Sequence, residues 1–182
     1  MRRALVPTLA CLVVACEPPA EPPTSPQARH ASHATVSHAA AGGAEREIAQ
    51  LRALTARFHD FDAAVKAGWG AKITECFSDP QLGGMGYHYG NTALIDGVVD
   101  AQKPELLLYE PQKNGKLRFV AVEYIVPFTA WTAAQPPTLY GQSFHRNEAF
   151  GLWVLHVWHF RHNPSGIFMD WNPTVSCAYS GR

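Results

Sequence analysis

The sequence predicts an α+β fold: mainly an antiparallel β-sheet or small barrel, with one amphipathic helix at its N-terminal end. Two observations predict it. Helical periodicity is confined to Glu45–Gly68, and the rest of the chain consists of short apolar runs interrupted by Gly, Pro and Asn. Because no helical pattern separates these runs, consecutive strands should pair antiparallel. We expect residues 45–182 to form one domain, a typical length for a single core.

Residues 1–15 have the pattern of a secretion signal. Arg2 and Arg3 give a positive start, and the apolar run that follows is far shorter than the ~20 residues that span a bilayer. Small residues precede Cys16, and the segment resembles the bacterial lipoprotein signal, in which this cysteine becomes the lipidated first residue. Glu17 then implies the outer membrane, facing the periplasm or the outside. An ordinary cleaved signal with an incidental cysteine is the alternative.

Residues 16–44 are predicted to form an extended tether. Their first part is rich in proline, and the remainder is mostly Ala, Ser, His and Gly. His30, His33 and His38 lie here and suggest a metal-capturing tail. Chelation by an unfolded segment costs chain entropy, so a polar linker that contains histidines is the favoured interpretation.

Charge argues against nucleic acid as a partner. The chain has 15 Lys and Arg residues and 15 Asp and Glu residues, and loss of Arg2 and Arg3 with the signal leaves a slightly acidic protein. No run of basic residues stands out. Nucleic acids and anionic headgroups both need a basic surface. We therefore expect membrane contact only through the N-terminal lipid.

The cysteines predict one disulfide. Cys11 leaves with the signal and Cys16 carries the lipid, so Cys76 and Cys177 remain. In an oxidising compartment two remaining cysteines most simply form a bond with each other. A metal site that uses one or both thiolates is the alternative.

Glu45–Gly68 is predicted to be one continuous helix. Gly68 and Gly70 are plausible stop signals. Apolar residues recur at spacings of three and four along one stripe: Ile48, Leu51, Leu54, Phe58, Phe61 and Val65.

Several later runs are typical of strands: Gly83–Asn91, Glu105–Glu110, Lys116–Val126 and Phe150–Phe160. Asn114-Gly115 separates the second run from the third, and an Asn-Gly pair in that position is a strong hairpin signal.

Glu123 is the most unusual residue of these strands. Side chains alternate between the faces of a strand, which groups Glu123 with apolar residues: Leu117, Phe119, Ala121 and Ile125. A carboxylate that faces a core needs a partner, because an unpaired buried charge is very costly. The partner could be a metal ion, a histidine, or one of three arginines: Arg118, Arg146 and Arg161.

The same alternation separates two histidines of Phe150–Phe160. His156 shares a face with Leu152, Val154, Trp158 and Phe160, whereas His159 falls on the other face. His88 lies on the glycine side of its own strand, where a ligand has room.

We therefore predict that His88, Glu123 and His156, with His145 as a possible fourth member, bind a divalent transition metal. Two histidines and a carboxylate suit Fe(II), Zn(II) or Cu(II). Whether such a site is catalytic is left open, with Glu110 or Glu148 as loose candidates for an outer base. The alternatives are a metal-free polar site, structural histidines beside a Glu–Arg pair, and a glycan- or peptide-binding module lined by aromatic residues.

The domain resembles a group of uncharacterised exported bacterial proteins. The matching stretches include Gly84–Tyr89, Val122–Tyr124 and Trp171–Cys177. The resemblance implies export and supplies neither a substrate nor a mechanism.

Overall fold

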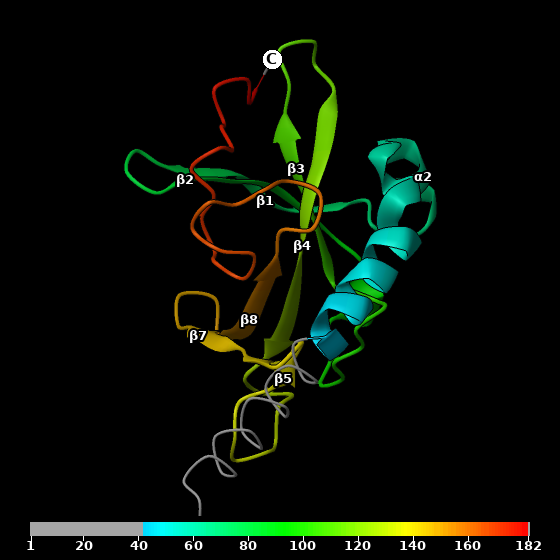
Figure 1. Cartoon of the computed structure of the whole chain (residues 1–182), viewed down its shortest axis with the longest axis vertical. Helices are drawn as coiled ribbons and strands as arrows, with labels where there is room; N and C mark the ends of the chain where they lie inside the picture. Colours follow the sequence, from blue (N-terminus) through cyan, green and yellow to red (C-terminus); the bar gives the residue numbers. More distant parts are fainter. Residues whose placement is uncertain (1–41, 182) are drawn as a thin grey trace, which may run out of the picture.

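The computed structural model describes residues 42–181. The predicted signal, Cys16 and the tether up to residue 41 lie outside the described residues. The α+β prediction is confirmed, because a helical segment packs beside a curled, six-stranded antiparallel sheet that forms a half-barrel (Figure 1). The sheet has the order β1-β2-β3-β4-β8-β7. Its strands are β1 (Ala71–Asp79), β2 (Gly83–Gly90), β3 (Leu106–Pro111), β4 (Leu117–Pro127), β8 (Leu152–Val157) and β7 (His145–Asn147).

Shorter elements complete the fold. They are η1 (Ala56–His59), α2 (Phe61–Lys66), η2 (Thr92–Leu94) and a two-stranded sheet of β5 (Thr138–Leu139) and β6 (Gln142–Ser143). Within residues 42–181, no helix is both long and apolar enough to cross a membrane.

The predicted continuous helix is interrupted. An α-helix over residues 42–55 begins three residues before the expected start and runs into η1, after which Asp60 adopts an extended conformation. The Asp60 carboxylate accepts a hydrogen bond from the backbone N–H of Asp62 and so caps a new helix, α2. The break changes the direction of the chain between η1 and α2. As a result, the apolar residues of the predicted stripe no longer all face the core. Leu51 and Phe58 are buried, whereas Leu54 and Val65 are 47% and 44% exposed.

The Asn114-Gly115 hairpin is confirmed between β3 and β4. Gly115 has φ +77°, and the N–H of Gln112 donates to the carbonyl of Lys116 at 2.8 Å. The pairing then contains a bulge, because Leu108 pairs with Ala121 while Tyr109 pairs with Phe119. The extra residue, Val120, rotates the first part of β4.

Because of the bulge, Glu123 shares its face with only two of the four residues predicted to lie there. Ala121 and Ile125 share the face away from the helix, as predicted, whereas Leu117 and Phe119 pack in the core on the helix side. Phe160 also packs on the helix side, because regular pairing of β8 ends at Val157 and the chain turns.

The two faces of the sheet carry separate cores. The larger lies under the helical segment and includes Leu107, Tyr109 and Val122. The smaller lies on the opposite face, which the C-terminal segment (orange to red in Figure 1) helps to cover. The predicted disulfide is present, and Cys76–Cys177 ties this segment to β1 with a Cα–Cα distance of 5.7 Å.

Candidate metal centre

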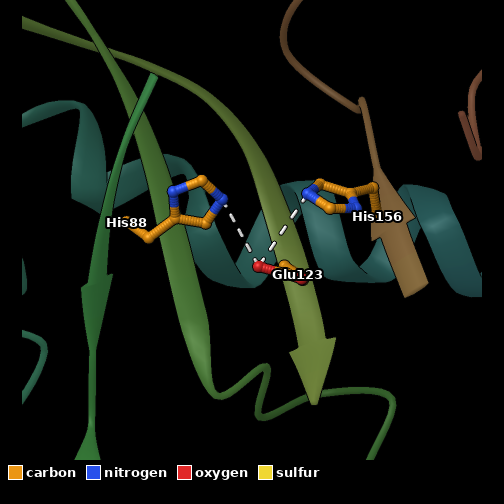
Figure 2. A group of neighbouring side chains, drawn as sticks. All are labelled: His88, Glu123 and His156. Atoms are coloured by element: carbon orange, nitrogen blue, oxygen red, sulfur yellow. Dashed lines mark ion pairs between the residues drawn. The ribbon is translucent and has the colours of Figure 1, made fainter. Parts of the chain in front are cut away.

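Three of the predicted ligands meet on the smaller-core face. Glu123 of β4 lies directly opposite His156 of β8, and His88 of β2 reaches across β3 to the same carboxylate. Glu123 Oε2 lies 3.4 Å from His88 Nε2 and 3.8 Å from His156 Nε2 (Figure 2). All three residues are buried, and one ligand atom from each lies within 4.8 Å of the others.

These separations suit a metal ion. With bonds of 2.0–2.2 Å, neighbouring ligand atoms of a tetrahedral or octahedral site lie about 2.8 to 3.6 Å apart. Both distances from Glu123 Oε2 to the histidine nitrogens lie within a few tenths of an ångström of this range. In the described part of the chain, these three residues are the one group of His, Cys, Asp and Glu side chains that meets this proximity criterion.

His156 has one unpaired nitrogen. Its Nε2 is the single buried side-chain nitrogen or oxygen among residues 42–181 that has no hydrogen-bond partner. Its Nδ1 lies 3.0 Å from Asp170 Oδ1, and a carboxylate can only accept there, so Nδ1 carries a proton. In the neutral ring, Nε2 then presents a lone pair to the cluster. A carboxylate bound to the outer nitrogen is the usual support of a metal-binding histidine.

His88 is held in a similar way by a hydroxyl group. Thr74 Oγ1 lies 2.8 Å from His88 Nδ1, which leaves Nε2 directed toward Glu123. Burial, with a contribution from the nearby His156, lowers the pKa of His88 to about 3. The ring is therefore neutral at physiological pH, which is the form that binds metals.

The other two members form a polarised pair. Burial raises the pKa of Glu123, and the nearby His156 opposes part of that rise. Burial alone would lower the pKa of His156, but the charges of Glu123 and Asp170 outweigh it and raise that pKa. Both shifts favour a proton on this pair when no metal is bound, and a divalent cation would displace that proton.

His145 does not join the three ligands. Its Nε2 lies 3.0 Å from Asp170 Oδ2, and its side chain is 48% exposed. His145 is therefore not a fourth ligand in this structure. It contacts Asp170, the carboxylate that lies behind His156. The short strand β7 places His145 opposite Val154, two residues before His156, which explains why it comes near without entering the cluster.

The three arginines considered as partners of Glu123 do not pair with it. No arginine within residues 42–181 forms an ion pair with Glu123; Arg146 pairs with Glu148, and Arg161 donates to Thr174. Glu110 accepts a hydrogen bond from the backbone of Ser176. Neither Glu110 nor Glu148 lies among the groups that contact the cluster, so the loose assignment of an outer base to them gains no support.

Two residues of the site were not predicted. Thr74 belongs to β1, whose sequence has no strong alternation, and Asp170 lies in a segment without regular structure. Both reach the histidines through tertiary contacts, so no local pattern marks them.

Two tryptophans are unsuited to stacking on a glycan. Trp69 and Trp158 are buried, and their indole N–H groups donate to the carbonyls of Pro104 and Met169.

Comparison with protein-family models, curated proteins and solved structures gives no match to this chain. The assignment therefore rests on the geometry of the site.

Proposed function

We propose that this chain is a lipid-anchored protein of the bacterial cell envelope that binds one divalent transition metal through His88, Glu123 and His156. The observation that carries the proposal is the unpaired Nε2 of His156. A buried polar atom without a partner costs about 1–3 kcal/mol, so native proteins seldom keep one without a role. A metal ion satisfies it together with His88 Nε2 and the Glu123 carboxylate.

The ligand set favours a catalytic metal over a structural one. Structural zinc sites are closed by four protein ligands, whereas catalytic sites keep a position open. Among residues 42–181, three protein ligands meet here, and they line a cavity of about 80 Å³. Two histidines and one carboxylate with open positions suit Fe(II), and also Zn(II) or Cu(II). The ion would act as a Lewis acid or activate a bound water.

The location rests on the N-terminal sequence. The signal pattern and Cys16 support export and lipid attachment, and the resemblance to exported bacterial proteins supports the same compartment. The Cys76–Cys177 disulfide is consistent with an oxidising environment. Mass spectrometry of the mature N-terminus should find diacylated Cys16, and Cys16→Ser should abolish the acylation. A mature chain with an unmodified cysteine would contradict the lipid anchor.

Metal content tests the central proposal. The full chain would be exported without a histidine tag, with His30, His33 and His38 changed to alanine so that the N-terminal segment contributes no ligands. We expect near one equivalent of a single metal by elemental mass spectrometry. His88→Ala and His156→Ala should lose it while remaining folded by circular dichroism, and His162→Ala, at an exposed position, should retain it.

The same experiment can also refute the metal site. A folded protein that is isolated without metal, and whose spectrum does not change with Zn(II), Cu(II) or Fe(II), would refute the metal site. A metal-free envelope interaction module would then be the better account.

A further inference from the structure

The cavity beside the metal centre has one polar end and apolar walls. His88, Glu123 and His156 form the polar end, with Thr74, Asn147 and Asp170 nearby. The remaining lining side chains are apolar and come from β1, β2, β3, β4, β8 and the turn before β8: Ile73, Phe77, Met85, Leu106, Ile125, Phe150, Leu152 and Val154. Its volume of about 80 Å³ would hold about two to three water-sized groups.

Large apolar side chains at this cavity are exposed to solvent. Ile73, Phe77 and Phe150 are 42%, 36% and 57% exposed, and the rings of the two phenylalanines lie 6.5 Å apart between centroids. The two rings are close enough to pack against each other, and they form one exposed apolar patch at the edge of the cavity. A ligand longer than the cavity can extend outward along this patch.

The charges of the lining select the ligand's polar group. No Lys or Arg lines the cavity, and its acidic residues are Glu123 and Asp170. Asp170 already engages His145 and His156. Within its own ligand set, a divalent ion bound by Glu123 as the one carboxylate keeps one net positive charge, which one anionic oxygen ligand would neutralise; the Asp170 carboxylate lies behind His156, outside that set. Without the ion, the same acidic lining would repel an anion.

We propose that this cavity binds a small organic monocarboxylic acid, with the carboxylate on the open position of the metal and a short apolar tail along the cavity wall. The inference rests on the proposed metal site and adds its ligand class. The apolar walls contain no groups that would recognise a second charge or a sugar. A short aliphatic acid combines the one anionic head and the apolar body that this lining accommodates.

A chain-length series tests the inference. The protein would be loaded with Co(II), whose visible absorption bands report ligand exchange, and titrated with acetate, propionate, butyrate and hexanoate. Each buried CH₂ contributes about 0.8 kcal/mol, or about fourfold in affinity. We expect a gain of about 16-fold from acetate to butyrate, followed by a smaller gain for hexanoate as its tail passes the two phenylalanines.

Paired variants locate the tail. Phe150→Ala should weaken hexanoate binding several-fold and leave acetate unchanged. Val98→Ala removes another exposed apolar side chain, 64% exposed and outside the cavity, and should change neither.

The outcomes separate the two proposals. If Co(II) does not bind, the metal site itself is refuted. If Co(II) binds but all four acids have equal affinity, or if Phe150→Ala and Val98→Ala behave alike, the tail site is refuted while the metal site stands. Binding of butanol as tightly as butyrate would refute the anionic head.

Discussion

The β8 region buries two histidines on opposite faces of the sheet, and they differ in the partners of their Nε2 atoms and in the charges around them. His159, just beyond the strand, faces the helix, where its Nδ1 lies 3.1 Å from the carbonyl of Val157 and its Nε2 lies 3.0 Å from Thr55 Oγ1. His156 faces the smaller core with Nδ1 on Asp170 and Nε2 without any hydrogen-bond partner. Both nitrogens of one ring are satisfied by the fold, and one nitrogen of the other is not.

The charges around the two histidines also differ, and they shift the two pKa values in opposite directions. Burial, with contributions from Arg52 and His59 nearby, lowers the pKa of His159 to about 4. Burial would do the same to His156, but Glu123 and Asp170 raise its pKa instead. A neutral ring with two partners is what a structural histidine needs. A lone pair beside two carboxylates is what a metal ligand needs, and this contrast distinguishes the two roles better than burial does.

The sharpest test of this contrast is Glu123→Gln. It should lower metal affinity by more than about 10³-fold, because loss of an outer partner alone costs about 10–100-fold. It should change the stability of the metal-free protein by less than about 1 kcal/mol, because the amide has the shape of the carboxyl group and His156 can become neutral, so no unpaired charge is left buried. Zn(II) calorimetry and thermal unfolding in EDTA measure the two effects.

A larger loss of stability in metal-free Glu123→Gln would contradict this account and make the carboxylate a structural group. Asp62→Gln, which alters an exposed acid outside the cluster, controls for general charge effects.

The structural histidine should make the protein sensitive to acid. The folded-state pKa of His159, about 4, lies below its ordinary value of 6.5, so the unfolded chain binds more protons between these values. Its contribution is therefore full above pH 6.5 and is lost as the pH falls to 4, by about 3 kcal/mol at most. His159→Leu should remove this part of the pH dependence while metal content stays the same.

Urea unfolding in EDTA between pH 7 and 4 would measure this effect. A wild-type minus variant difference that does not shrink toward pH 4 would show that His159 does not titrate as proposed.

Alternation along the strands predicted the faces of Glu123 and His156 correctly, because strand pairing around them is regular. Glu123 and His156 face one another because β4 and β8 pair without a shift over Val122–Pro127, so simple alternation was sufficient. The bulge at Val120 precedes this stretch. Simple alternation therefore assigned Leu117 and Phe119 to the wrong face but Glu123 to the correct one. One extra residue after position 121 would have turned the carboxylate to the helix side.

The features that were missed depend on distant contacts. Asp170 is positioned by an irregular segment held through the Gly84–Asn172 bridge and the Trp158–Met169 hydrogen bond. Neither is visible in a local pattern. The helix break could have been predicted from the sequence. Asp is a preferred N-cap residue, so Asp60 inside a helical pattern is compatible with the start of a new helix.

Asp170→Asn should have an intermediate effect. The amide oxygen can still accept from His156 Nδ1, but without the negative charge that makes the ring a stronger ligand. We expect metal affinity to fall by about 10–100-fold with the fold intact. A competition titration with a chromophoric chelator would measure it, and Asp62→Asn would serve as the exposed control. An unchanged affinity would show that this carboxylate does not support the ligand.

His145→Ala should have the smallest effect. Its contact with Asp170 is half exposed, and exposed polar or charged pairs contribute at most about 1 kcal/mol, or about fivefold in affinity. The same titration distinguishes a partner of Asp170 from a fourth ligand, because loss of a direct ligand would match His156→Ala. Since the hydrogen bond of His145 at this site is to the carboxylate behind His156, its removal should have little further effect in the Asp170→Asn background. A full additional loss there would place His145 on the metal itself.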